Sequence, residues 1–171
     1  MQEDQPIVRV AIRYGLMFGL ISSIYSVLLY VFQVETNKLL PQLSWVLFIL
    51  AIVLAIKEYR KQNQGFVSYG QGVSIGALTA AIIGLTSGLI STFYLQVIDK
   101  TPLQRISDYT RQSLEEQGLD DQAIENALEM SQKFQTPGMI FLFSVVGSAI
   151  IGLILSLIIA AILQKKRPVF E

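Results

Sequence analysis

The chain has 171 residues, of which 52% are apolar and 15% are charged, and its formal net charge is zero. Average soluble domains carry about 25% charged residues, so this composition leaves too few polar side chains to cover a globule. Because the sequence contains no cysteine and no histidine, it excludes disulfides, thiolate nucleophiles, thiolate zinc sites and imidazole acid–base pairs. The thirteen basic and thirteen acidic residues cancel, so no global charge indicates nucleic-acid binding.

Four long segments without charged residues predict an all-α membrane protein with four transmembrane helices. A bilayer core of about 30 Å requires about 20 predominantly apolar helical residues, and lipid favours helices because it offers backbone polar groups no partner. The predicted spans are residues 14–34, 39–56, 72–98 and 138–163. We expect the first span to be an uncleaved signal anchor, because its apolar run is longer than that of a usual signal peptide. Residues 1–171 would then form a single membrane domain.

The distribution of basic residues predicts that both termini are cytoplasmic, because cytoplasmic segments carry an excess of lysine and arginine. With four spans, the N-terminal tail, the connection after the second span and the C-terminal tail share one face. That face holds eight basic residues, whereas the opposite face holds five basic residues and nine carboxylates. The eight are Arg9, Arg13, Lys57, Arg60, Lys61, Lys165, Lys166 and Arg167.

The segment between the third and fourth spans, residues 99–136, is predicted to form two helices outside the cytoplasm. Thr101 and Pro102 indicate a helix start, with threonine as the cap and proline in the first turn. Gly118 ends this helix, and Asp120 caps a second helix that runs to about Gln135. Apolar residues at helical spacing give the second helix one apolar stripe, formed by Ile124, Ala127, Leu128 and Phe134. We expect a helical hairpin that lies over the outer membrane surface.

Acidic residues recur every four positions on another face of the second helix, at Asp121, Glu125 and Glu129. This face could bind a cation or a basic partner. Hard cations need several convergent oxygen ligands, as in the loop D-x-D-x-D-G, and the spacing here differs from that pattern. We therefore predict a solvated face, supported by an ion pair between Glu129 and Lys133 at i,i+4, that serves as a docking surface and not as a metal site.

Small residues recur with a period of four in three of the spans. In membranes, helices associate through close backbone packing, which small residues permit. These stripes therefore predict tight helix–helix contacts, either within one chain or between subunits. The first span contributes Gly15, Gly19 and Ser23; the third contributes Gly72, Gly76, Ala80, Gly84 and Gly88; the fourth contributes Ser144, Ser148, Gly152, Ser156 and Ala160.

The connection between the second and third spans combines glycines, aromatic residues and basic residues. Its distinctive positions are Tyr59, Arg60, Gly65, Tyr69, Gly70 and Gln71. Glycine permits positive φ or a close backbone approach, and Phe66 and Tyr69 are suited to the lipid headgroup layer. We expect a tight turn with interfacial anchoring, and a site for a small ligand is the alternative.

These residues also resemble a known family. The stretches Tyr59-Arg60, Gly65-Phe66-Val67-Ser68-Tyr69-Gly70-Gln71, Leu114-Glu115-Glu116-Gln117-Gly118 and Ala127-Leu128-Glu129-Met130 are similar to the uncharacterised membrane family catalogued as domain of unknown function 4199, which is widespread in Bacteroidota. The resemblance covers nearly the whole chain. It implies a bacterial inner-membrane protein with four spans, and it brings no catalytic residues and no activity. A shorter internal similarity, Tyr14-Gly15 against Tyr69-Gly70, leaves open whether the two helix pairs are a true repeat.

The predicted spans contain no aspartate, glutamate, lysine or arginine. Ion-coupled transporters, proton relays and intramembrane enzymes usually depend on such groups, so we expect no catalytic residues, no metal and no cofactor. The leading hypothesis is a non-enzymatic scaffold or accessory subunit that contacts a second copy or another membrane protein. The alternative is a small transporter or channel with an uncharged pore lined by serine, threonine and glycine.

Overall fold

Four long helices form the main body of the structure. The computed structural model describes residues 7–165, and within that range the long helices are α1 (Ile7–Val31), α2 (Leu43–Gln62), α3 (Tyr69–Phe93) and α6 (Pro137–Leu163). A 3₁₀ turn, η1 (Leu40–Gln42), precedes α2, and a π-helical turn, η2 (Tyr94–Ile98), continues α3. With these two turns included, all four helices are long and apolar enough to cross a membrane. The chain is therefore a multi-pass membrane protein.

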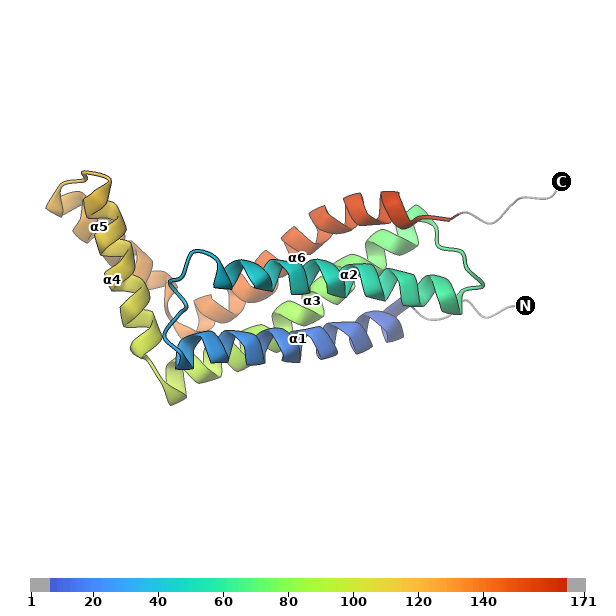
Figure 1. Ribbon diagram of the computed structural model, residues 1–171, viewed down its shortest axis with the longest axis horizontal. Helices are drawn as coiled ribbons and strands as arrows, with labels where there is room; N and C mark the ends of the chain where they lie inside the picture. The colour runs from blue at the N-terminus through green and yellow to red at the C-terminus, as the bar shows by residue number, and fades with distance from the viewer. Residues whose placement is uncertain (1–6, 166–171) are drawn as a thin grey trace.

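Two shorter helices, α4 (Thr101–Glu116) and α5 (Asp121–Phe134), connect η2 to α6. They lie across one end of the four long helices, which we call the α4–α5 end (Figure 1). The beginning of α1, the α2–α3 connection and the end of α6 lie at the other end, which we call the opposite end.

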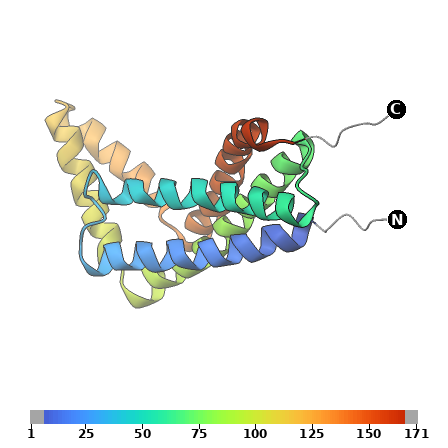
Figure 2. The same cartoon turned by 45° about the vertical axis from the view of Figure 1, so that its right-hand side comes forward.

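Helix α3 is the central element of the bundle. Its main packing partners are α6 and α1, and α2 completes the bundle beside α1 and α3. In Figure 2, α6 crosses α3 at a clear angle, whereas α1 and α2 run nearly side by side. The largest cluster of buried apolar residues lies toward the opposite end and includes Ile52, Ile56, Tyr59 and Ile75.

Helix α1 differs from the first predicted span at both ends. Helix α1 is already formed at Ile7, and it ends at Val31 rather than at residue 34. Gln33 adopts a left-handed conformation with φ of 58°. The amide of Val34 donates to the Leu29 carbonyl, and the amide of Gln33 donates to the Tyr30 carbonyl, which together make a Schellman ending. Because this ending usually carries glycine at the left-handed position, the glutamine here gave no sequence indication of it.

The second and third helices also extend beyond their predicted limits. Helix α2 continues six residues past position 56 to Gln62, because lysine, glutamate and arginine are good helix formers outside the apolar layer. Helix α3 begins at Tyr69 rather than at residue 72, since Ser68 and Gln71 form a capping box at its start. The fourth span agrees with α6 to within one residue.

The start of α4 differs from the prediction in its capping residue. Thr101 lies within the first turn, and Asp99 accepts hydrogen bonds through Oδ1 from the Thr101 amide, at 2.9 Å, and from the Thr101 hydroxyl. Asp120 caps α5 as predicted, because its side chain accepts a hydrogen bond from the Ala123 amide. Gly118 lies between the two helices with φ of 78°.

Candidate functional site

The small-residue stripes of α3 and α6 face each other along most of their length. We call this contact the small-residue interface. A Cβ atom built on Gly72 would lie 2.8 Å from the Cβ atom of Ala160, and one built on Gly88 would lie 2.9 Å from that of Ser144. The facing pairs run antiparallel in a constant register: Gly72–Ala160, Gly76–Ser156, Ala80–Gly152, Gly84–Ser148 and Gly88–Ser144.

A hydrogen bond crosses the small-residue interface. The Ser144 hydroxyl donates to the Gly84 carbonyl at 3.1 Å, whereas the Ser148 and Ser156 hydroxyls donate to carbonyls of their own helix. The two backbones are so close that a Cβ atom on Gly84 would lie 2.6 Å from the Ser144 carbonyl oxygen. These two stripes are therefore in contact within one chain.

The stripe of α1 packs against a different side of α3. A Cβ atom on Gly15 would lie 2.6 Å from the Ile82 Cβ atom, and one on Gly19 would lie 2.7 Å from the Thr86 Cβ atom. Ser23 is fully buried, and its hydroxyl donates to the Gly19 carbonyl at 2.6 Å. Helix α3 thus lies between two close-packed partners.

The distinctive residues of the α2–α3 connection are spread over three elements and not over one loop. Tyr59 and Arg60 lie on α2, only Gly65 lies in the turn, and Tyr69, Gly70 and Gln71 form the first turn of α3. Gly65 has φ of 86°, so it needs the conformational freedom of glycine. Gly70 has open space around it, whereas Gly15 is tightly packed, so the two glycines of the internal similarity differ in their surroundings.

Several of these residues tie the end of α6 to the α2–α3 connection. Val67 and Lys165 exchange backbone hydrogen bonds of 3.0 and 2.8 Å, and the Lys165 ammonium lies 5.9 Å from the centre of the Phe66 ring. The Arg60 guanidinium donates to the Leu163 carbonyl at 3.4 Å, where the helix lacks an internal donor. Tyr59 is buried in the core. These contacts give the connection a structural role in closing the opposite end.

A partly buried polar cluster lies at the α4–α5 end, and the sequence analysis did not identify it. The Arg105 Nε atom of α4 lies 2.5 Å from Oε1 of Glu35, and an Arg105 terminal nitrogen donates to the Tyr30 carbonyl at 3.1 Å. The Tyr30 ring stacks on Tyr94 in η2, with 5.7 Å between the ring centres. These four residues, which we call the Arg105 cluster, connect α4 to the end of α1 and to η2.

The carboxylate of Glu35 is only partly paired. Its side chain is 4% exposed, and its second oxygen, Oε2, is buried with no hydrogen-bond partner among the described residues. Such a group is costly and depends strongly on the one partner that it has. Glu35 and Arg105 are 70 residues apart and follow no motif, so spacing alone could not have revealed the pair.

The acidic face of α5 lies on the surface of the protein. Asp121, Glu125 and Glu129 are exposed, whereas Ile124 and Leu128 between them are buried, where α5 packs against α4. Within residues 7–165, no group of three or more acidic residues is arranged to hold a metal ion.

Two details of the predicted second outer helix were wrong. The expected ion pair between Glu129 and Lys133 is not among those of residues 7–165; instead Glu125 pairs with Arg111 of α4 at 3.1 Å, because α4 brings a guanidinium to that side. Phe134 does not continue the buried stripe. It is 45% exposed and packs edge-on against Phe143 of α6, since the helix ends there and the chain turns toward the bundle.

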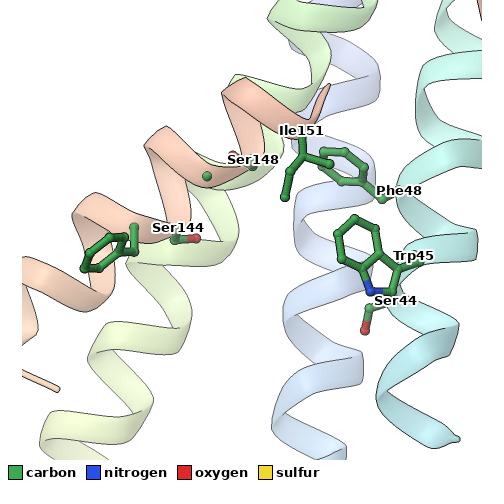
Figure 3. A pocket seen from close by; sticks show the side chains of 8 residues that line it. Ser44, Trp45, Phe48, Ser144, Ser148 and Ile151 are labelled. Atoms are coloured by element: carbon green, nitrogen blue, oxygen red, sulfur yellow. The ribbon is translucent and has the colours of Figure 1, made fainter. Parts of the chain in front are cut away.

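A groove separates α2 from α6 in the half of the bundle near the α4–α5 end. Figure 3 shows Trp45 and Phe48 on α2 facing Ser148 and Ile151 on α6. The groove has a volume of about 310 Å³, and two of its serine hydroxyls, those of Ser144 and Ser148, are already bonded to carbonyls. Its lining is therefore mainly aromatic and aliphatic.

Comparison with known proteins identifies one family. The family model described as "Protein of unknown function (DUF4199)" matches residues 13–165, which is nearly the whole chain, so the chain belongs to this family. No curated protein and no solved structure matches it.

Proposed function

We propose that this member of the DUF4199 family is a non-enzymatic scaffold or accessory subunit of an assembly in the bacterial inner membrane. In this proposal both termini are cytoplasmic, and α4 and α5 form an extracytoplasmic helical hairpin whose acidic face binds a basic segment of a membrane-protein partner. In this proposal the protein also contacts the lipid bilayer, and it binds no nucleic acid and no cofactor.

The observation that carries the proposal is how firmly α4 and α5 are attached to the bundle. The Arg105–Glu35 ion pair joins α4 to the connection that follows α1, and the stacked Tyr30 and Tyr94 rings join α1 to η2. Helix α5 then presents Asp121, Glu125 and Glu129 outward. A charged and exposed surface favours recognition of a partner of opposite charge.

The alternative, a transporter or channel with an uncharged pore, receives less support from the helix packing. The small residues that would line such a pore are instead used in direct contact between α3 and α6. The groove beside them is lined by Trp45, Phe48 and Ile151, which suit lipid better than a polar solute.

The orientation is tested by cysteine labelling, which the cysteine-free chain makes simple. In intact spheroplasts, an impermeant thiol reagent should label Gly118→Cys, between α4 and α5, and should spare Gln62→Cys, at the end of α2. The reverse pattern would refute the orientation and with it the extracytoplasmic docking surface.

Partner binding is tested by purification in mild detergent with two matched variants. The docking variant combines Asp121→Asn with Glu129→Gln and leaves the Glu125–Arg111 pair intact. The control combines Asp108→Asn with Glu115→Gln on α4, which removes the same charge from the neighbouring helix. We expect a membrane protein to co-purify in fixed ratio with the wild type and the control, and to be reduced with the docking variant, most strongly at low salt. Equal recovery with all three proteins would contradict the proposed docking face.

A further inference from the structure

A small polar pocket lies between the α1–α2 connection and α4, at the same end as the Arg105 cluster. We call it the loop–α4 pocket. It has a volume of about 230 Å³ and is lined by Lys38, Tyr109, Gln112, Ser113 and Glu116. Lys38 comes from the connection, and the other four residues lie on one face of α4, because they are spaced three, four and seven positions apart.

The pocket holds one positive and one negative side chain that do not pair with each other. Lys38 and Glu116 both line it, yet neither takes part in the ion pairs found within residues 7–165. Gln112 holds the carboxylate in place, since its Nε2 donates to Oε1 of Glu116 at 3.2 Å. The two opposite charges are therefore available to a ligand that carries both signs.

The surrounding contacts hold the chain on either side of Lys38. Three residues earlier in the chain, Glu35 is bonded to Arg105, which lies one helical turn before Tyr109 on α4. Asn37 Oδ1 accepts hydrogen bonds from the amides of Leu39 and Leu40, at 2.8 and 3.2 Å, and so shapes the turn that contains Lys38. The connection is thus anchored on both sides of the lysine.

The size and position of the pocket indicate its ligand. Its volume is below the roughly 300–1,000 Å³ of sites for drug-sized molecules. Leu39, the next residue after Lys38, is 79% exposed, and Phe32 in the same connection is 69% exposed. Because these apolar residues stand at the end of the spans, they would contact the acyl region of a membrane.

We propose that the loop–α4 pocket binds the phosphoethanolamine headgroup of a phospholipid. The phosphate would pair with Lys38 and the primary ammonium would donate to Glu116, with Tyr109 beside the cation. The acyl chains would extend past Leu39 along the bundle. A lipid with a quaternary ammonium would bind less well because it has no N–H group to donate to Glu116, and a lipid with only an anionic headgroup would leave Glu116 without a partner.

The test uses the full chain, freed of native lipid in detergent and then mixed with short-chain phospholipids. Native mass spectrometry measures how much phosphatidylethanolamine, phosphatidylcholine and phosphatidylglycerol stays bound. The pocket variants are Lys38→Gln and Glu116→Gln. Their controls are Lys133→Gln and Glu115→Gln, which make the same charge changes outside the pocket. Folding of every variant is checked by its elution volume and melting temperature.

We expect the wild type and both controls to bind phosphatidylethanolamine about tenfold more tightly than the other two lipids. A tenfold preference corresponds to about 1.4 kcal/mol, which is close to the lower end of the range for one hydrogen bond to a charged group. Glu116→Gln should abolish the preference over phosphatidylglycerol, whereas Lys38→Gln should weaken binding of all three lipids.

Three results would overturn the proposal. The first is a wild type without a preference for phosphatidylethanolamine, and the second is an equal loss in the pocket variants and their controls. The third is that free O-phosphoethanolamine displaces the bound lipid as effectively as phosphatidylethanolamine does. In that case the ligand would be a soluble zwitterion. Because labelling sidedness and partner recovery are not read in this experiment, its failure is distinguishable from failure of the proposed function.

Discussion

The close approach of Gly84 to the Ser144 carbonyl allows a quantitative test of the packing at the small-residue interface. In Gly84→Ala, the new Cβ atom would lie 2.6 Å from that backbone oxygen. Unlike a side chain, the carbonyl cannot rotate away, so α3 and α6 would have to separate. The separation would also stretch the hydrogen bond of 3.1 Å from the Ser144 hydroxyl to the Gly84 carbonyl.

The expected size of the effect follows from three contributions. Overpacking costs about 1–3 kcal/mol, and an interhelical hydrogen bond in a membrane contributes about 0.6 kcal/mol. Alanine recovers about 1 kcal/mol over glycine through helix propensity. We therefore expect Gly84→Ala to lower the free energy of unfolding by roughly 0.6–2.6 kcal/mol.

The matched control is Gly147→Ala on α6, where a new Cβ atom would meet nothing within 4 Å. This variant has the same chemical change and the same gain in propensity without the collision, so its stability should equal or exceed that of the wild type. The measurement is reversible unfolding in mixed micelles with increasing SDS. Equal stability of Gly84→Ala and Gly147→Ala would refute the argument that backbone proximity holds α3 to α6.

Three further predictions concern the polar contacts at the ends of the helices. Arg105→Gln should lower the free energy of unfolding by about 3–5 kcal/mol because it leaves the buried Glu35 charge unpaired. Glu35→Gln should lower it by less, because it removes that charge. The reverse order of the two variants in the same SDS assay would refute the role of burial. Ser68→Ala should cost about 1 kcal/mol through loss of the capping box, with the exposed mid-helix Ser74→Ala as a nearly neutral control. Hydrogen bonds from the side chain and then the backbone of Thr101 lower the pKa of Asp99 below its ordinary value of 3.8, so their stabilising effect is present above that pH and is lost as the pH falls through the lower folded-state pKa. Amide-exchange protection at the start of α4 should decrease in that acidic range and should become independent of pH in Asp99→Asn.

The number and approximate position of the spans could be predicted because lipid imposes a strong compositional demand on them. Helix ends were less predictable. A helix ends where its backbone groups find other hydrogen-bonding partners, and this point need not coincide with the end of the apolar run. At residues 31–34 a glutamine takes the left-handed position usually held by glycine, and at residues 57–62 charged residues simply continue α2. The capping box of Ser68 and Gln71 was present in the sequence as S-x-x-Q and would have located the start of α3.

The Arg105 cluster was harder to predict than the helix ends. In the sequence, Glu35 follows the first predicted span and Arg105 lies in the segment between the third and fourth spans, and no motif connects the two. Their pairing depends on η2 and on the direction in which α4 leaves it, and these are properties of the folded chain. The loop–α4 pocket depends on the same arrangement, because Lys38 reaches α4 only when the α1–α2 connection is held against it.

Helix α6 shows why close approach, and not apolarity, decides which face of a membrane helix is buried. Its sequence carries two stripes with a period of four: the small residues from Ser144 to Ala160, and the isoleucines at positions 150, 154, 158 and 162. In water the isoleucines would be the natural core. Here they are 53–75% exposed, whereas Gly152, Ser156 and Ala160 are buried. Lipid tails solvate isoleucine as well as a protein interior does, so its burial gives little advantage. Only the small residues let the α6 backbone approach α3 closely enough to gain dispersion contacts and a hydrogen bond that lipid cannot replace.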